Sequence, residues 1–106
     1  MAKYLLRVSY TLDGVKGVVK EGGTARVEAA TKAATDLGGS IDDFYFAFGE
    51  DDAIVICDFP DVVSAAALSL VVAAAGGVRL STTPLITPAE IDAAVKLHPD
   101  YRPPGA

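Results

Sequence analysis

Residues 44–57 read Phe-Tyr-Phe-Ala-Phe-Gly-Glu-Asp-Asp-Ala-Ile-Val-Ile-Cys, and they carry the strongest indication of the fold class. Before the turn, side chains alternate between an all-phenylalanine face and a second face, which indicates a strand over residues 40–48. After it, the apolar run of residues 53–57 is typical of another strand. The polar connection of residues 49–52 is so short that the two strands are expected to form an antiparallel hairpin.

On the N-terminal side of the hairpin, a strand and helical segments are expected. Residues 4–10 alternate with a period of two and predict a strand. Residues 12–20 place three valines at helical spacing and end at the glycine pair Gly22-Gly23. We expect Thr24 to cap a longer helix that the second glycine pair, Gly38-Gly39, closes.

On the C-terminal side, Asp61 is positioned to cap an alanine-rich helix over residues 62–75. Residues 78–85 alternate as a fourth strand. Thr87-Pro88-Ala89-Glu90 then has the pattern of a capping box, with proline at the first helical position, and predicts a short helix to about residue 97. The proline-rich residues 98–106 are expected to form an extended tail.

The order of elements predicts an α+β fold of the ferredoxin-like type, β-α-β-β-α-β with an extra C-terminal helix. Residues 1–97 form the predicted domain and residues 98–106 its tail. Helices cover one face of the four-stranded antiparallel sheet. We expect Phe44, Phe46 and Phe48 on one face of the sheet, and Tyr45 with Val55 and Phe59 on the other. Because both faces are then apolar, we predict that two sheets associate into a dimer or a multiple of dimers.

The charge balance excludes several classes of partner. The chain of 106 residues has a net charge of −5 and a pI near 4.6, so we expect no nucleic acid and no anionic membrane surface as partner. The longest apolar run, residues 62–75, is shorter than the about 20 residues of a membrane-spanning helix. With a single cysteine, Cys57, and no apolar signal segment, a reduced, cytoplasmic setting is expected.

Several motifs resemble those of the GYD-domain family. They lie in residues 2–11, 22–26, 44–50 and 82–90, so the resemblance covers nearly the whole chain. It implies a small bacterial-type protein of the dimeric α/β-barrel group, in a family without an established activity. At the Gly-x-Tyr-Asp motif this chain reads Gly49-Glu50-Asp51-Asp52, so Asp51 stands where the family has tyrosine, and a role for Asp52 stays open.

Four residues are candidate ligand contacts: Tyr10, Arg26, Tyr45 and Asp52. Arg26 follows a helix start whose free N–H groups attract anions, and its guanidinium could hold a carboxylate. It could equally form a structural ion pair with Asp52. Tyr45 and Tyr10 could donate a hydrogen bond to a ligand, or pack at an interface.

Other reactive side chains have simpler explanations. The acidic turn of residues 49–52 is read as a solvated hairpin tip rather than a metal site, and we expect no metal and no cofactor. His98, the one histidine, suits a helix C-terminus. Cys57 is read as a small buried side chain.

Three functions fit these features. The first is a non-catalytic oligomeric module that binds a small ligand or a protein partner. The second is a cofactor-free isomerase or monooxygenase on a small cyclic or aromatic substrate, which would need Arg26, Tyr45 or His98 to converge on a pocket. The third is a structural assembly protein without a pocket.

Overall fold

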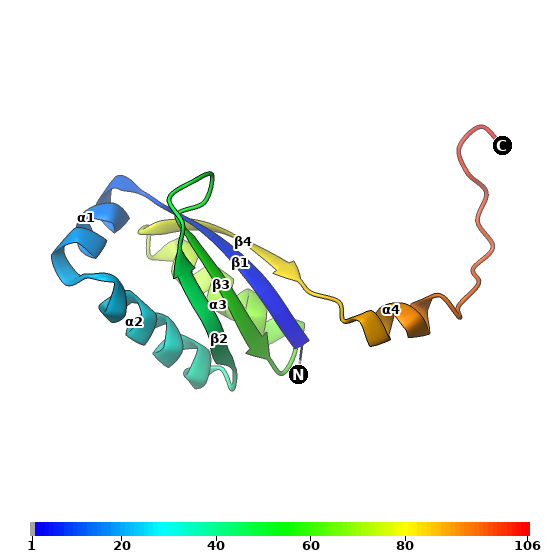
Figure 1. Cartoon of the computed structure of the whole chain (residues 1–106), viewed down its shortest axis with the longest axis horizontal. Helices are drawn as coiled ribbons and strands as arrows, with labels where there is room; N and C mark the ends of the chain where they lie inside the picture. The colour runs from blue at the N-terminus through cyan, green and yellow to red at the C-terminus, as the bar shows by residue number, and fades with distance from the viewer. Residues whose placement is uncertain (1) are drawn as a thin grey trace.

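The computed structural model describes residues 2–106, and its elements follow one another in the expected order (Figure 1). The strands are β1 (Ala2–Tyr10), β2 (Ser40–Phe46), β3 (Ala53–Phe59) and β4 (Val78–Pro84). The helices are α1 (Leu12–Glu21), α2 (Gly23–Asp36), α3 (Val62–Ala74) and α4 (Pro88–Ala94).

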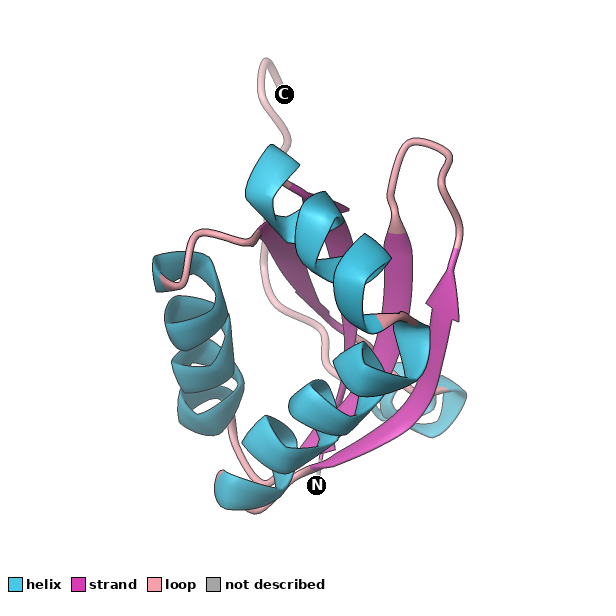
Figure 2. Ribbon diagram, turned by 90° about the vertical axis from the view of Figure 1, so that its left-hand side faces the viewer, coloured by secondary structure: helices cyan, strands magenta, loops and turns pink. Residues whose placement is uncertain are grey.

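The four strands form one antiparallel sheet in the order β2-β3-β1-β4. The hairpin expected from residues 44–57 is present as β2 and β3, and each βαβ crossover returns to the sheet beside β1 or β3. Figure 2 shows the resulting two layers, with helices against one side of the twisted sheet. This is the ferredoxin-like α+β fold that the order of elements predicts.

The core lies between the sheet and the helices α2 and α3. It contains alternate residues of the two central strands and small or branched residues of the helices. The buried members are Tyr4, Leu6, Val8, Ala34, Ala53, Val55, Cys57, Phe59, Ala65 and Leu68. The second face of the sheet carries no helix, and we call it the open face.

One expectation about the two faces is wrong. Val55 and Phe59 lie on the helix-covered face and not with Tyr45, because directly paired residues of neighbouring strands point to the same side. Phe44 pairs with Val55, whereas Tyr45 pairs with Ile54. The apolar side chains of the open face are therefore those of Leu5, Tyr45, Ile54 and Ile56.

Ion pairs flank the apolar centre of the open face. The Lys3 ammonium lies 2.6 Å from an Asp42 oxygen and 3.3 Å from an Asp58 oxygen. The Arg7 guanidinium donates to Asp51 at 2.8 Å. These side chains are partly exposed, so each pair contributes little to stability, but their charges already have partners within the chain.

The helix starts agree with the sequence at two of three places. The Asp61 carboxylate accepts from the Ser64 N–H at 2.8 Å, and Thr87 and Glu90 form the complete capping box. Thr24 does not cap α2. The chain passes from α1 into α2 through Gly22, whose positive φ of 84° makes it the N-cap, and no side chain accepts from the first turn.

Several element ends also differ from expectation by one to three residues. β2 ends at Phe46, because Phe48 leaves the strand with a φ of 53°. Its ring nevertheless stacks on Phe46, with 5.9 Å between centroids. β4 ends at Pro84 instead of residue 85, and α4 ends at Ala94 instead of about residue 97. Element ends fray and are less sharply defined than element interiors.

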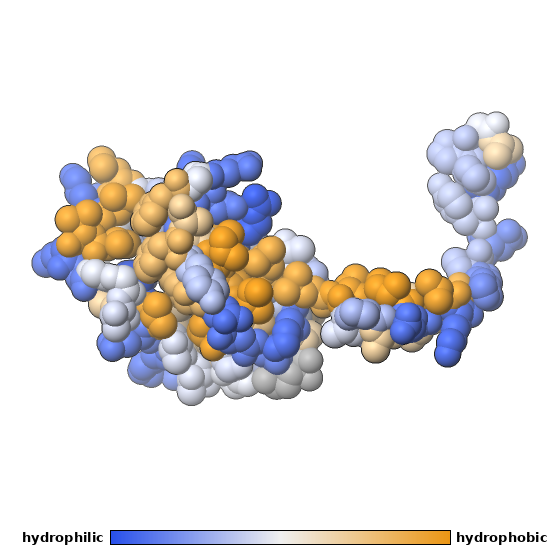
Figure 3. Space-filling model, in the orientation of Figure 1, coloured by the Kyte–Doolittle hydropathy of each residue, from blue (hydrophilic) through white to orange (hydrophobic). Residues whose placement is uncertain are grey.

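Residues 86–106 leave the body of the molecule, and we call them the C-terminal arm (Figure 1). The radius of gyration is 16.9 Å, whereas a compact chain of this length has roughly 13 Å. Figure 3 shows an apolar strip along α4 that continues onto the body. No helix within residues 2–106 is long and apolar enough to cross a membrane.

Candidate functional site

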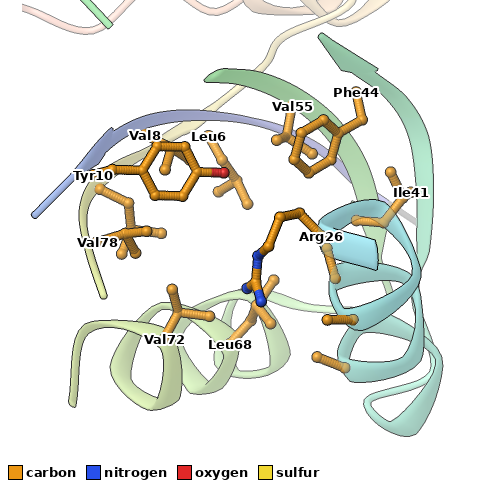
Figure 4. A pocket seen from close by; sticks show the side chains of 14 residues that line it. Leu6, Val8, Tyr10, Arg26, Ile41, Phe44, Val55, Leu68, Val72 and Val78 are labelled. Carbon is orange, nitrogen blue, oxygen red and sulfur yellow. The ribbon is translucent and has the colours of Figure 1, made fainter. Parts of the chain in front are cut away.

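A cavity of about 120 Å³ lies between the helix-covered face of the sheet and helices α2 and α3 (Figure 4). Its walls are almost entirely apolar, and small alanines of α2 leave the space that larger side chains would fill. The lining residues are Leu6, Val8, Tyr10, Arg26, Ala29, Ala30, Ala33, Ile41, Phe44, Val55, Leu68, Val72, Val78 and Leu80. The geometry is that of a small-molecule pocket with a few polar groups.

Arg26 is the one charged side chain among these lining residues. It stands in the first turn of α2 and extends into the cavity between the two helices (Figure 4). None of the salt bridges within residues 2–106 includes it. A positive charge at the N-terminal, positive end of a helix dipole is unfavourable on its own. An anion in the cavity would be attracted by the Arg26 guanidinium and by this end of α2.

Tyr10 brings the second polar group to the cavity. It ends β1, and its hydroxyl points across the space toward the Arg26 side (Figure 4). Partial burial raises the pKa of Tyr10, and the positive charge of Arg26 lowers it in part. The hydroxyl is therefore protonated at neutral pH and available as a donor. The ring stacks on Phe46 with 6.4 Å between centroids, which fixes its plane.

Asp52 supports Tyr10 rather than facing the cavity. Its carboxylate accepts the Tyr10 backbone N–H at 2.8 Å, and its own N–H donates to the Val8 carbonyl at 2.8 Å. The alternative of an Arg26–Asp52 ion pair is not found, since the salt bridges do not include it. Asp52 is thus a positioning residue for the end of β1.

The remaining candidates lie elsewhere. Tyr45 is on the open face with 67% of its surface exposed, and His98 is exposed in the C-terminal arm. In the hairpin turn, Asp51 pairs with Arg7. Within residues 2–106 no three side chains of the metal-binding types lie together. The structure brings together Tyr10, Arg26 and, indirectly, Asp52.

The mouth of the cavity opens into a wider hollow that shares Tyr10, Arg26 and Val78 with it. Its rim is held by Thr11, whose hydroxyl donates to the Gly76 carbonyl at 2.9 Å and whose N–H donates to the Gly77 carbonyl at 3.1 Å. The acidic side chains Asp13 and Glu21 also line this outer hollow. They would favour ligands whose anionic group sits inside, at Arg26, and not at the rim.

Sequence reasoning missed the contributions of α3 and of the α2 alanines to the cavity. Leu68 and Val72 stand four residues apart on α3, and Ala29 and Ala33 do so on α2. That spacing identifies a helix face turned toward the core. It does not say that the facing side chains leave a space.

Comparison with known proteins finds one match. The sequence model of the GYD domain matches residues 4–95. No curated protein and no solved structure matches the chain.

Proposed function

The chain belongs to the GYD-domain family, and on this premise we propose that it is a homo-oligomeric module that binds a small anion with an apolar body, without catalysis. Arg26 and the Tyr10 hydroxyl receive the anionic group. The apolar walls receive the rest of the ligand.

The observation that carries this proposal is the charge of Arg26 in an otherwise apolar cavity. An unpaired guanidinium beside Leu68 and Val72 loses part of its hydration without a carboxylate to replace it. A bound carboxylate would restore charge-assisted hydrogen bonds, which are the strong ones. The Tyr10 hydroxyl adds a donor whose position Asp52 and Phe46 hold.

The size of the cavity sets the size of the ligand body. A benzene molecule fits an apolar protein cavity of about 150 Å³. The cavity of about 120 Å³ between the sheet and the helices opens into the outer hollow, so it suits a ring of five or six atoms or a short branched chain. Larger substituents would extend into the outer hollow beyond Tyr10.

The proposal is tested by titrating ¹⁵N-labelled protein with benzoate, cyclopentanecarboxylate and the neutral analogue benzamide. We expect amide shifts in α2 and at the end of β1 with the carboxylates, and at least roughly tenfold weaker binding of benzamide, because the charged hydrogen bonds are lost. Arg26→Gln should weaken carboxylate binding to the same extent.

A matched control is Arg79→Gln, which removes one positive charge from β4 and leaves the cavity lining intact. It should bind the carboxylates as the unchanged protein does. Equal binding of carboxylates and amide, equal losses in both arginine variants, or no shifts at the cavity would each contradict the proposal.

The enzyme alternative needed Arg26, Tyr45 or His98 to converge on a pocket within the subunit. Only Arg26 does so, and it has no titrating partner at the cavity other than Tyr10. For that reason we favour binding over an isomerase or monooxygenase. Conversion of a bound carboxylate during the titration, visible as new ligand signals, would instead support the enzyme.

The proposal includes association through the open face. Leu5, Ile54 and Ile56 form an apolar centre there, and the charges of Lys3 and Arg7 on the same face are paired. A second sheet can cover this centre without burying Lys3 or Arg7 as unpaired charges, because Asp43 and Arg79, which also lie on this face, are on the edge strands β2 and β4. We place the protein in the cytoplasm because its single thiol, Cys57, is a buried free cysteine.

A further inference from the structure

The C-terminal arm is a formed structure whose apolar side is left in solvent. Ile91 and Val95, the residue at the C-cap of α4, stand four residues apart and lie on one side of the helix, with 47% and 64% of their surfaces exposed. Further exposed apolar side chains precede and follow them in the arm: Ile86, Leu97 and Tyr101. The capping box of Thr87 and Glu90 stabilises α4 through contacts within the arm. The apolar side of α4 is therefore formed in the single chain, without a partner.

The arm starts from a fixed point. The Leu85 N–H donates to the Lys3 carbonyl at 2.9 Å and holds the chain to β1. After Leu85, the hydrogen bonds described for the arm stay within the arm, as at Thr87 and Glu90. The arm is thus anchored beside the sheet and unsupported beyond it.

The exposed area is large enough for a stable interface. The chain exposes 7231 Å², whereas a compact monomer of the same mass exposes roughly 5,600 Å². The excess of roughly 1,600 Å² is about twice what each partner contributes to an interface of standard size. The excess exposed surface is therefore large enough to be covered by a second protein.

The position of the arm indicates a second copy of this chain as that occupant. The arm and the open face border one hollow, which Lys3 and Asp58 line from the sheet and Ile86 and Glu90 from the arm. Figure 3 shows the apolar surface continuing from the sheet onto α4. A molecule that covers the open face therefore meets the arm as well. In a two-fold pair, each copy would cover both surfaces of the other.

We infer that the C-terminal arm binds a second copy of this chain, with the side of α4 that carries Ile91 and Val95 packed against the copy that covers the open face. This inference rests on the proposed association through the open face and adds the arm as a second contact between the two copies, which we call the clasp. The arm's apolar side chains become buried only in the pair.

The test is sedimentation equilibrium of three full-length proteins. In the first variant, Ile91→Glu and Val95→Glu are combined, which places charges on the apolar side of α4. In the matched control, Ala89→Glu and Ala93→Glu place the same charges at the same spacing on the opposite side. The unchanged protein should be dimeric, the Ile91/Val95 variant should self-associate at least roughly tenfold more weakly because two buried apolar side chains are lost, and the control should remain dimeric.

The outcomes separate this inference from the association on which it rests. A monomeric unchanged protein would overturn both. Dimers of equal strength in all three proteins would overturn the clasp alone. Equal weakening in both variants would also overturn it, because the apolar side of α4 would then have no special part.

A second measurement distinguishes the partner copy from the arm's own chain. A spin label is attached at Leu97→Cys in unlabelled protein, which is mixed with ¹⁵N-labelled unchanged protein. We expect amide broadening in the ¹⁵N-labelled copies. Broadening only when both labels are in one chain would show that the arm folds back, against the inference. Unchanged protein treated with the label is the control, since Cys57 is buried.

Discussion

At the scale of single residues, the carboxylate of Asp52 accepts a hydrogen bond from the backbone of Tyr10 and does not face the cavity. Its 2.8 Å hydrogen bond holds the end of β1, where the Tyr10 ring turns into the cavity beside Arg26. An acidic residue in a hairpin turn thus positions a phenol that lies far from it in sequence. Three segments that are separate in sequence therefore build the candidate site: the end of β1, the first turn of α2 and the turn between β2 and β3.

Cys57 provides a prediction about pH. Burial, followed by the negative charges of Asp42 and Asp58, raises the pKa of the Cys57 thiol from 9.0 to about 11. Above pH 9 the unfolded chain releases this proton while the folded chain retains it, so the free energy of unfolding falls between pH 9 and about 11 and is undiminished below that range.

The measurement is urea unfolding of the unchanged protein and of Cys57→Ala at pH 8 and near pH 10. The substitution leaves a small cavity at both pH values, but only the unchanged protein loses thiol-linked stability. The difference between the two proteins should therefore shrink at the higher pH. A difference that stays constant would show that the thiol does not carry the raised pKa.

At the scale of elements, α1 fits against the turn between α3 and β4 through a glycine. A Cβ at Gly14 would lie 1.8 Å from the backbone carbonyl oxygen of Gly77, whereas a Cβ at Gly17 would meet nothing within 4 Å. Both glycines are inside the same helix, where local propensity alone disfavours them equally. They differ in packing, because only Gly14 lies against another part of the backbone.

We therefore predict opposite effects of two alanine substitutions in α1. Gly14→Ala should lower the free energy of unfolding by at least about 2 kcal/mol, because a backbone atom cannot move aside as a side chain could. Gly17→Ala should raise it by about 0.5–1 kcal/mol through helix propensity. Urea unfolding of both variants checks the signs, and equal effects of the two would refute the packing argument.

At the scale of the whole molecule, one chain leaves two apolar surfaces uncovered, the open face and the C-terminal arm. Helices α2 and α3 complete the core on one side of the sheet only. The other side keeps Leu5, Ile54 and Ile56 partly accessible. A sheet of this kind is complete when a second layer covers it.

We predict that Leu5→Glu dissociates the oligomer. The new carboxylate would stand in the centre of the open face, where pairing with a second sheet would bury it without a partner. Light scattering coupled to size exclusion should report half the mass of the unchanged protein. Val19→Glu is the control, since Val19 is exposed on α1 and away from the open face. An unchanged mass for Leu5→Glu would place the interface elsewhere.

Much of the fold could be read from local patterns. Alternation identified the strands, the short connection of residues 49–52 made the hairpin antiparallel, and Asp61 and Thr87 marked helix starts that the structure confirms. These features depend on neighbours within a few residues, so short segments of sequence are enough to predict them. Thr24 failed as a cap because the backbone of Gly22, which a pattern of side chains does not describe, turns the chain two residues earlier.

The candidate site was accessible only in part. Helix position and residue type were enough to single out Arg26 and Tyr10, which both line the cavity. They also singled out Tyr45, whose side of the sheet depends on the pairing of Tyr45 with Ile54. A period of two gives the two faces of a strand but not which of them the helices cover.

Patterns along the chain are therefore enough to predict the order of elements, the antiparallel hairpin and the membership of the GYD-domain family. Three features depend on the folded arrangement: Tyr10 and Arg26 line one cavity, Asp52 accepts a backbone hydrogen bond, and α4 stands away from the body. The physical reason is that local patterns fix backbone conformation, whereas cavities and uncovered faces depend on how side chains distant in sequence fill the space between elements.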